Sequence, residues 1–270
     1  MKVKRVITGL VGFPLVVLLL IFANIYVIDV VFSIVALITI MEFSNNFGET
    51  AKPVKWIAYL SSIFIAFLHV IPEEIFGTVF GVAISGIIAA LFIQVIITNM
   101  KTTFNDIAIT FFGIIYIVGF LIFIPLLYAY ENGKLLVWYI VFAAWGSDTF
   151  AYFVGSKFGK HKLTKVSPNK SVEGSIGGLL GTVILFLGYT YALNYYTALN
   201  LSYIYIAGLA VILSGLGQFG DLAASSIKRF TGNKEFGNLL PGHGGILDRI
   251  DSIIFISPFA FFLLTLLMKI

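Results

Sequence analysis

Long apolar runs separated by short polar segments dominate the hydrophobic pattern of this chain. A helix needs about 20 predominantly apolar residues to cross the hydrocarbon core of a bilayer. Nine windows of the sequence approach that length, and they cover 6–24, 27–45, 54–72, 76–99, 105–129, 134–156, 175–195, 201–224 and 250–269. The pattern therefore predicts an all-α polytopic integral membrane protein with about nine transmembrane helices.

Composition supports this fold class. The 270 residues are 59% hydrophobic and 11% charged, whereas soluble domains are about 45–50% apolar and about 25% charged. The chain contains no cysteine, which excludes disulfides, thiolate metal sites and cysteine nucleophiles. The first 24 residues have the basic start and apolar run of a signal peptide, but no small-x-small cleavage site follows, so we expect a retained first helix.

The distribution of lysine and arginine predicts the orientation. With the N-terminus inside, nine spans place 15 of the 17 basic residues on the inner side, and only Lys134 and Lys269 outside. By the positive-inside rule, the N-terminus is cytoplasmic and the C-terminus lies outside. Two polar inner loops, 157–174 and 228–249, then share one face. We expect one continuous membrane domain, with N-terminal helices in 1–130 and a polar, functional region in 131–270.

Charged residues gather near the C-terminus, between apolar segments. A charge at bilayer depth costs about 2.5–3.5 kcal/mol on insertion scales, so such a group persists only if it is paired, hydrated or metal-bound. This stretch, Gly215–Asp251, includes Asp221, Lys228, Arg229, Lys234, His243, Asp248, Arg249 and Asp251.

Asp248 and Asp251 are three residues apart in GILDRIDSIIF. On a helix this spacing places both carboxylates on one face, while Arg249 is rotated by about 100° and can pair elsewhere. Two converging carboxylates without a cysteine or histidine cluster suit a hard cation such as Mg²⁺. The alternative is a pair of solvated acids at a helix start, where the helix dipole favours them.

Asp221 follows the glycine-rich segment GLGQFG and shares a helical face with Ser225 and Lys228. The glycines permit a broken helix whose backbone amides receive phosphate. Alternatively, they only let two helices pack closely. A buried aspartate without a partner is costly, so we expect a metal or another cation beside Asp221.

Asp148 lies near the inner end of the sixth predicted span, where it could pair with a lysine of the next loop or contact a metal or nucleotide. The following loop, KVSPNKSVEGSIGG, offers Lys170, Ser171 and Glu173. It lacks the G-x-x-x-x-G-K-[ST] pattern, which argues against P-loop chemistry. Inner-loop lysines usually serve the membrane surface, but Lys170 and Glu173 lie beside a predicted helix start and are candidates for function.

Three basic residues, Lys228, Arg229 and Lys234, could bind a triphosphate or a lipid phosphate, with arginine as a bidentate fork and lysine as a point charge. His243 lies between two glycines. It could donate to a phosphate, or it could be a loop residue satisfied by the backbone.

The region Ser225–Asp251 resembles the signature of the phosphatidate cytidylyltransferases, which runs S-x-x-K-R, a spaced Lys-Asp, and P-x-H-G-G-x-x-D-R-x-D. The region Asp148–Gly174 resembles two further elements of that family, W-x-x-D-x-x-A-Y-x-x-G and S-P-x-K-[ST]-x-E-G. One departure stands out: Lys234-Glu235 occupies the place of the usual Lys-Asp. Glutamate keeps the charge of aspartate, but its carboxylate reaches farther by one methylene group.

The resemblance implies transfer of a cytidylyl group from CTP to phosphatidic acid, giving CDP-diacylglycerol and pyrophosphate for phospholipid synthesis. It implies a divalent-metal-dependent nucleotidyltransferase that uses Mg²⁺, with a monovalent cation as a second ion to consider. The residues expected to be catalytic are Asp221, Lys228, Arg229, Asp248 and Asp251. The expected metal ligands are Asp148, Asp221, Asp248 and Asp251. The residues expected to bind substrate are Lys170, Ser171, Glu173, Ser225, Lys234, His243 and Arg249.

The expected partners are CTP, phosphatidic acid and the lipid bilayer, without nucleic acid; a homodimer is left open. The expected location is a bacterial-type inner (plasma) membrane, with the active site facing the cytoplasm. Two alternatives remain: a CTP-dependent polyprenol or lipid kinase, and an ion-coupled transporter that uses the intramembrane aspartates. Against a transporter, the charges collect on one side rather than at the midplane between two halves.

Overall fold

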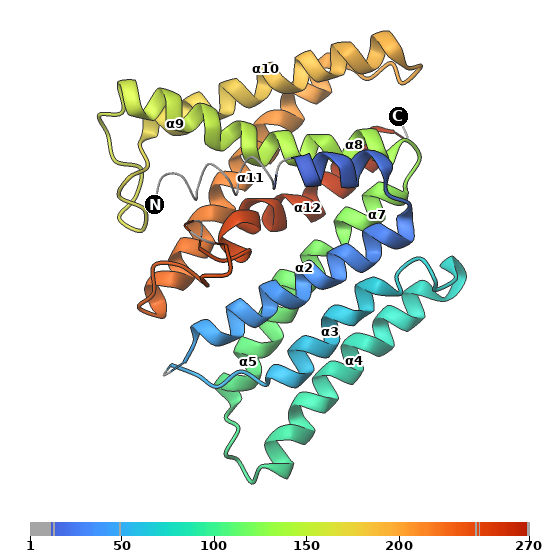
Figure 1. The fold of residues 1–270 in the computed structure, drawn as a ribbon, viewed down its shortest axis with the longest axis vertical. Helices are drawn as coiled ribbons and strands as arrows, with labels where there is room; N and C mark the ends of the chain where they lie inside the picture. The colour runs from blue at the N-terminus through green and yellow to red at the C-terminus, as the bar shows by residue number, and fades with distance from the viewer. Residues whose placement is uncertain (1–11, 13, 49, 241, 243, 269–270) are drawn as a thin grey trace. The chain divides into compact units, whose positions relative to one another are not determined.

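The computed structural model describes residues 12, 14–48, 50–240, 242 and 244–268. Its elements are helical (Figure 1), and within these residues extended segments pair only as isolated bridges, Lys162 with Ser171 and Leu240 with Gly244. The all-α prediction is confirmed. The elements are α2 (Ile25–Asn46), α3 (Lys55–Ala66), α4 (Glu73–Ile97), α5 (Phe104–Gly113), the π-helical η1 (Ile114–Val118), α6 (Gly119–Leu121), α7 (Phe123–Ala129), α8 (Gly133–Val141), the π-helical η2 (Phe142–Gly146), α9 (Ser147–Phe158), α10 (Val172–Tyr196), α11 (Tyr203–Phe230) and α12 (Leu247–Leu267).

Among the described residues, seven helical segments are long and apolar enough to cross a membrane, and each matches one predicted window. They are Ile25–Asn46, Glu73–Ile97, Phe104–Ala129, Gly133–Phe158, Val172–Tyr196, Tyr203–Phe230 and Leu247–Leu267. The window 6–24 lies partly outside the described residues, although 14–22 are helical. The window 54–72 holds only the 12-residue helix α3, so the count of nine spans stays a prediction.

Helix α3 is short because the chain turns directly after it. The backbone N–H of His69 in this turn donates to Asp29 Oδ2 (3.3 Å), and His69 Nδ1 lies 2.9 Å from Asp29 Oδ1. Pro72 then precedes α4. Asp29 is fully buried in α2, so the turn supplies the partner that an acid inside an apolar helix requires.

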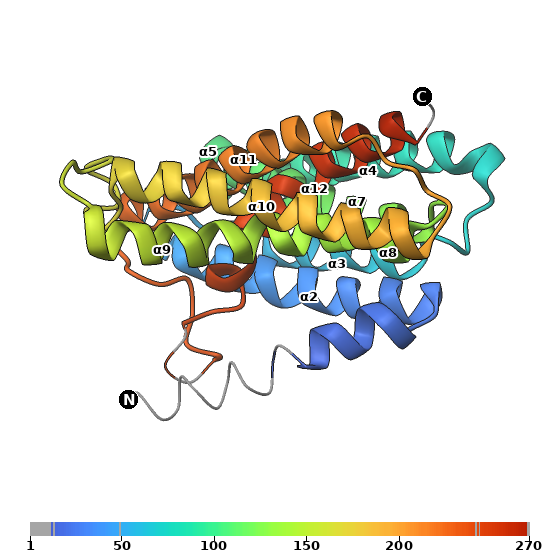
Figure 2. The same cartoon turned by 90° about the horizontal axis from the view of Figure 1, so that it is seen from above.

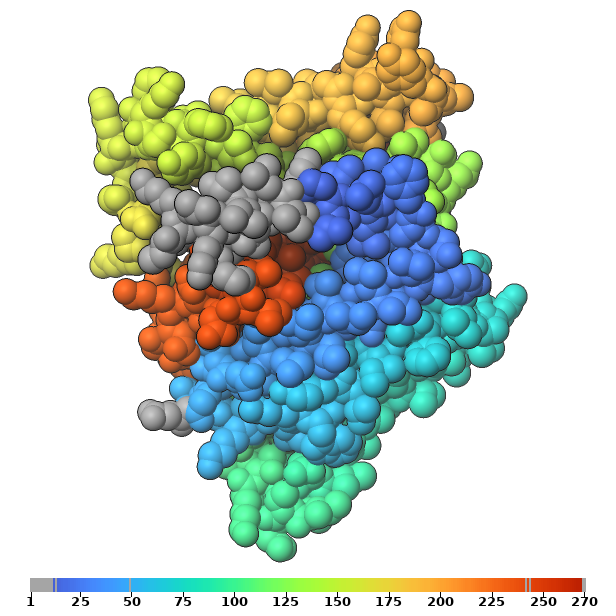
Figure 3. Space-filling model, in the orientation of Figure 1, coloured from blue at the N-terminus to red at the C-terminus, as the bar shows by residue number. Residues whose placement is uncertain are grey.

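Helix α2 exposes apolar side chains and buries several polar ones together with Ile28, Ile40 and Phe43. Val27, Val30 and Ile34 are exposed, whereas Asp29 and Glu42 are buried. In Figure 3 the darkest blue belongs to residues that precede α2, and the lighter blue to α2 and its neighbour α3. Helix α3 also exposes large apolar side chains. A helix on a soluble protein shows the opposite pattern, so this arrangement suits a surface that faces lipid.

The chain divides into two compact units. The first comprises Met1–Pro125 with Phe230–Arg249, and the second comprises Leu126–Arg229 with Ile250–Ile270. In the first unit α2, α3, α4 and α5 pack against one another (Figure 1). In the second unit α9 and α10 lie side by side and antiparallel (Figures 1 and 2).

Glycines set the close packing of α9 against α10. A Cβ atom added to Gly178 would lie 2.9 Å from the Ser147 carbonyl oxygen and 3.0 Å from Gln218 Nε2. A Cβ atom on Gly174 would lie 2.8 Å from the Ala151 carbonyl oxygen. The two glycines are four residues apart, the small-xxx-small spacing that lets membrane helices approach backbone to backbone. This contact fixes α9, the helix that carries Asp148.

We expect Gly178→Ala to lower the melting temperature of the detergent-solubilised protein, because overpacking a tight contact costs about 1–3 kcal/mol. Gly188→Ala on the same helix is the matched control. A Cβ atom there meets nothing within 4 Å, and alanine is the better helix former by up to about 1 kcal/mol. Equal melting temperatures for the two variants would contradict the packing argument.

Candidate active site

Close packing of α11 against α12 determines where the acids of the second unit lie. Helix α11 runs without a break through its glycine-rich segment, so the broken helix with phosphate-binding amides, one of the two alternatives that the glycines left open, is not formed. A Cβ atom on Gly220 would lie 2.6 Å from Phe255 Cβ and 3.1 Å from the Asp251 carbonyl oxygen, and one on Gly217 would lie 2.9 Å from Ile256 Cδ1. The glycines therefore serve helix packing, the alternative recognised from the sequence.

This packing brings three aspartates and a lysine into one electrostatic cluster. The carboxylate of Asp251, which is 5% exposed, interacts with Asp221, Lys228 and Asp148. One oxygen also accepts the Ser252 backbone N–H at 2.8 Å. The four side chains come from α9, α11 and α12. Several acids gathered around a buried carboxylate require positive charge nearby.

Lys170 supplies part of that charge, because its ammonium group forms an ion pair with Asp221. The lysine comes from the loop between α9 and α10, and both side chains are about a quarter exposed. The expected cation beside Asp221 is thus found within the chain. The pair joins two of the predicted site residues that are 51 positions apart in the sequence.

A polar network holds the helices around this cluster. Gln218 Nε2 donates to Ser147 Oγ (3.2 Å) and to the Ser175 carbonyl oxygen (3.1 Å), and Gln218 Oε1 accepts the Ser175 hydroxyl. The network links α9, α10 and α11.

Farther along α11, Ser225 and Lys228 are each 9% exposed. The π-helical segment η2 lies directly before Ser147, and such segments are frequent at functional sites.

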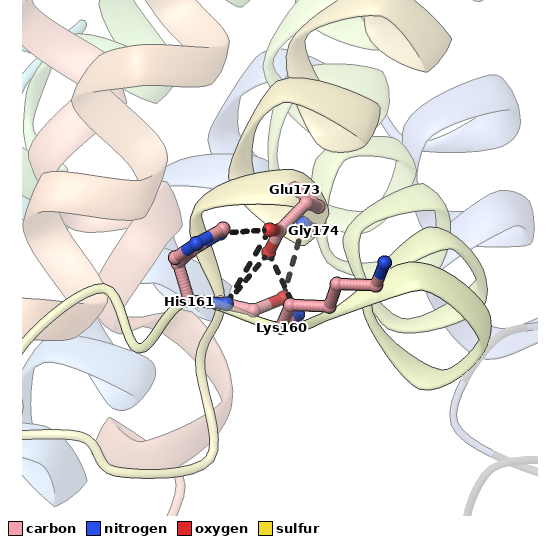
Figure 4. A network of polar contacts seen from close by, with 5 residues as sticks. Lys160, His161, Glu173 and Gly174 are labelled. Carbon is pink, nitrogen blue, oxygen red and sulfur yellow. Dashed lines mark hydrogen bonds and ion pairs between the residues drawn. The ribbon is translucent and has the colours of Figure 1, made fainter.

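Glu173 shapes the loop that presents Lys170 (Figure 4). Its carboxylate accepts the backbone N–H groups of Lys160 (3.1 Å) and His161 (3.3 Å) and lies 2.6 Å from His161 Nδ1. Next to it, Ser171 Oγ caps α10 by accepting the Gly174 N–H at 3.1 Å. Both residues were expected to bind substrate, and in the structure both make the hydrogen bonds that fold this loop.

In the first unit a residue that the sequence analysis missed holds the start of α12. The buried carboxylate of Glu42 on α2 accepts the N–H groups of Ile246 (3.0 Å) and Leu247 (2.8 Å). It therefore caps α12 from a distance of about 200 residues along the chain and faces the positive end of that helix dipole. A Cβ atom on Gly237 would lie 2.7 Å from Glu42 Oε1, and Gly245 is similarly close. Glycine is required at both places because the carboxylate lies against the backbone.

Asp248 and Asn46 hold the rest of this loop. Asp248 Oδ2 accepts the N–H groups of Phe236 (2.8 Å) and Gly245 (3.0 Å). Asn46, also on α2, donates to the Glu235 carbonyl oxygen (3.3 Å) and accepts the Thr231 hydroxyl. A sequence signal for Glu42 and Asn46 existed, since both are polar residues at the end of an apolar window.

A model of the cytidylyltransferase family matches residues 3–267. The chain belongs to this family. It is similar to the phosphatidate cytidylyltransferase of Bacillus subtilis (strain 168), with 38% identity over 187 residues, 68% of each chain. It is also similar to the phosphatidate cytidylyltransferase of Staphylococcus aureus (strain COL), with 36% identity over 248 residues, which cover 89% of this chain and 87% of the relative. The enzyme of that name from Staphylococcus saprophyticus is 39% identical over 196 residues, which cover 70% of this chain and 72% of the relative.

The remaining predicted residues of this cytidylyltransferase lie at the surface or outside the described part. Arg229, Lys234 and Arg249 are exposed, and His243 lies outside the described residues. Within the described ranges, no group of three or more histidine, aspartate or glutamate side chains is arranged to hold a metal ion. The acids that do cluster offer only oxygen donors, which is the donor set of a hard cation.

Proposed function

We propose that this protein transfers a cytidylyl group from CTP to phosphatidate and forms CDP-diacylglycerol and pyrophosphate. The observation that carries the proposal is the cluster of Asp148, Asp221 and Asp251 with Lys170 and Lys228 in a polytopic membrane chain of the cytidylyltransferase family. The relatives from Bacillus and Staphylococcus bear the name of this activity.

The reaction needs no covalent intermediate. An oxygen of the phosphatidate phosphate attacks the α-phosphorus of CTP and forms the new P–O bond. The bond from the α-phosphorus to the oxygen that bridges to the β-phosphorus breaks, and that oxygen keeps the electron pair in the departing pyrophosphate. A phosphate monoester is already ionised at neutral pH, so the protein must mainly position the reactants and neutralise their charge.

The basic residues meet that need. Lys228 is almost fully buried beside the acids, and Lys170 is held there by its ion pair with Asp221. Arg229 follows Lys228 on α11 and offers a bidentate fork for phosphate oxygens. We assign these three residues to the phosphates of CTP and phosphatidate. Only the family motif supports a substrate-binding role for Lys234, His243 and Arg249.

We further propose Mg²⁺ as the cofactor, with Asp221 and Asp251 as its principal ligands. Mg²⁺ is commonly bound through one or two carboxylates together with water and substrate phosphates, so two acids suffice. Asp148 and Asp248 are the additional ligands implied by the motif. When bound, the ion supplies positive charge that neutralises phosphate oxygens.

A direct assay tests the activity. Purified protein with phosphatidate, radiolabelled CTP and Mg²⁺ is expected to give labelled lipid on extraction, and omission of any component is expected to remove the label. Labelled lipid formed equally well with a chelator in excess would remove the metal from the proposal while leaving the transfer intact.

We propose that the site faces the cytoplasm, and the cysteine-free sequence offers a clean test. Lys165→Cys and Asn238→Cys, each as the only cysteine, are expected to react with an impermeant maleimide only from the cytoplasmic side. Ala198→Cys is expected to react only from outside. Labelling of Lys165→Cys and Asn238→Cys from opposite faces would contradict a common site for the two loops.

A further inference from the structure

A cleft of about 500 Å³ lies in the second unit, beside the acid cluster. It is formed by α9, the loop after it, the start of α10 and one residue of α11. The residues that line it are Asp148, Ala151, Tyr152, Gly155, Ser156, Leu163, Ser167, Asn169, Lys170, Ser171, Gly174, Ser175 and Gln218. Its volume falls within the range of small-molecule sites, about 300–1,000 Å³.

Charge is confined to part of this cleft. Asp148 and Lys170 are the two charged residues that line it, and both belong to or contact the acid cluster. Along α9 the lining continues through Tyr152 to Ser156, eight residues and therefore about 12 Å beyond Asp148. That part of the wall offers an aromatic ring and a hydroxyl group, and the lining of the cleft also includes the neutral Asn169 amide, next to Lys170 in the chain. A ligand that suits the cleft has an anionic end and a neutral, polar, flat end.

The wall of the cleft is held in shape before any ligand arrives. A Cβ atom on Gly155 would lie 3.1 Å from Ser171 Oγ and 3.4 Å from Gly174 Cα, so α9 and α10 approach closely at its floor. The contacts of Glu173 with Lys160 and His161 fix the loop above (Figure 4). A preformed wall reduces the ordering cost of binding.

We infer that this cleft binds the nucleoside part of CTP, with the triphosphate directed towards Lys170. Tyr152 provides the aromatic face for the pyrimidine, since stacking on aromatic side chains is a general way to hold a base. Asn169 provides an amide with both donors and an acceptor, suited to the edge of cytosine. The inference rests on the proposed function and assigns CTP, one of the two proposed substrates, to this cleft.

The lining argues against the lipid substrate as the occupant. Acyl chains require apolar walls, and the first unit shows what such walls look like. There a groove of about 490 Å³ is lined largely by apolar side chains, such as Leu60, Phe64 and Phe80. Nine of the 13 residues that line the cleft beside Lys170 carry a hydroxyl, amide or charged group, whereas few residues of that groove do.

The test separates binding of the nucleoside from binding of phosphate. For Tyr152→Ala and Asn169→Ala we expect the KM for CTP to rise by about 5- to 100-fold, the range expected for one lost stacking or polar contact. Inhibition by cytidine monophosphate should weaken by a similar factor. The KM for phosphatidate and inhibition by pyrophosphate should stay within about twofold of the wild-type values. Tyr152→Phe keeps the ring and is expected to restore the KM for CTP.

Tyr191→Ala is the matched control, because Tyr191 is 64% exposed, comparable with 70% for Tyr152, and does not line the cleft. A higher KM for phosphatidate with an unchanged KM for CTP would assign the cleft to the lipid and overturn the inference. So would behaviour of Tyr152→Ala and Asn169→Ala identical to that of the control. Wild-type protein that forms no CDP-diacylglycerol would instead refute the proposed function, so the two failures can be told apart.

Discussion

Asp251→Asn is expected to lower the turnover of CTP and phosphatidate at least about 100-fold in protein that remains folded. The substitution keeps the shape of the side chain and removes the buried negative charge that interacts with Asp221, Lys228 and Asp148. Loss of one preorganised electrostatic group in a site typically costs 10²–10³ in rate. Turnover, together with a Mg²⁺ titration, is the measurement, and the residual activity should require far more Mg²⁺ than that of the wild type.

Asp106→Asn is the matched control for this variant. Asp106 is as buried as Asp251, at 6% exposed, but its carboxylate accepts two backbone N–H groups. One is from Lys52 (2.6 Å), 54 residues away just before α3, and the other is from Thr103 (2.8 Å), the N-cap of α5. The control should lose about 1–3 kcal/mol of stability and keep the turnover of the folded fraction. Equal turnover in the two variants would remove Asp251 from the reacting centre. Asp221→Asn is expected to match Asp251→Asn, and Glu235→Gln to show a milder loss.

Glu42→Gln is expected to destabilise the start of α12 and to reduce activity about 10- to 100-fold. This carboxylate accepts the N–H groups of Ile246, directly before α12, and of Leu247, its first residue. Hydrogen bonds to a charged group contribute about 1.5–3 kcal/mol each. The first turn of α12 carries Asp248, and Asp251 follows one turn later on the same helix. Residues that orient metal ligands commonly affect activity by the same 10- to 100-fold factor.

Thermal unfolding and turnover of Glu42→Gln should be compared with those of Glu74→Gln. Glu74 is an exposed acid in the first turn of α4, so its loss should change neither quantity. If Glu42→Gln behaved like Glu74→Gln, the capping role assigned to Glu42 would be wrong.

The sequence was informative wherever one helix determined the geometry. The apolar windows predicted the seven long helices because chain length and hydrophobicity suffice for that inference. The i, i+4, i+7 spacing of Asp221, Ser225 and Lys228 was meaningful because α11 is a single helix through all three. The window 54–72 does not form one long helix. Helix α3 ends at Ala66, and the last residues of the window form the turn that brings His69 to Asp29.

Contacts between distant segments were not predictable in the same way. The glycines before Asp221 could break a helix or allow close packing, and only the neighbours Phe255 and Ile256 decide between the two. Lys170 was a candidate among several loop lysines, and its pairing with Asp221 depends on how α9 and α10 fold back. Glu42 could be noticed as a polar residue near the end of an apolar window, but its role could not be predicted. Its partners are backbone groups about 200 residues away, which leave no pattern in side-chain spacing.

The position of the label in CTP tests cytidylyl transfer most directly. Purified protein, phosphatidate and Mg²⁺ would be incubated in parallel with CTP labelled at the α-phosphorus and at the γ-phosphorus, and Asp251→Asn would serve as the inactive control. We predict that the α-label enters the lipid fraction and the γ-label leaves as pyrophosphate. Transfer of the γ-label to lipid would identify a CTP-dependent lipid kinase. Absence of both labels from lipid, together with ion or solute uptake by proteoliposomes, would contradict the transferase account.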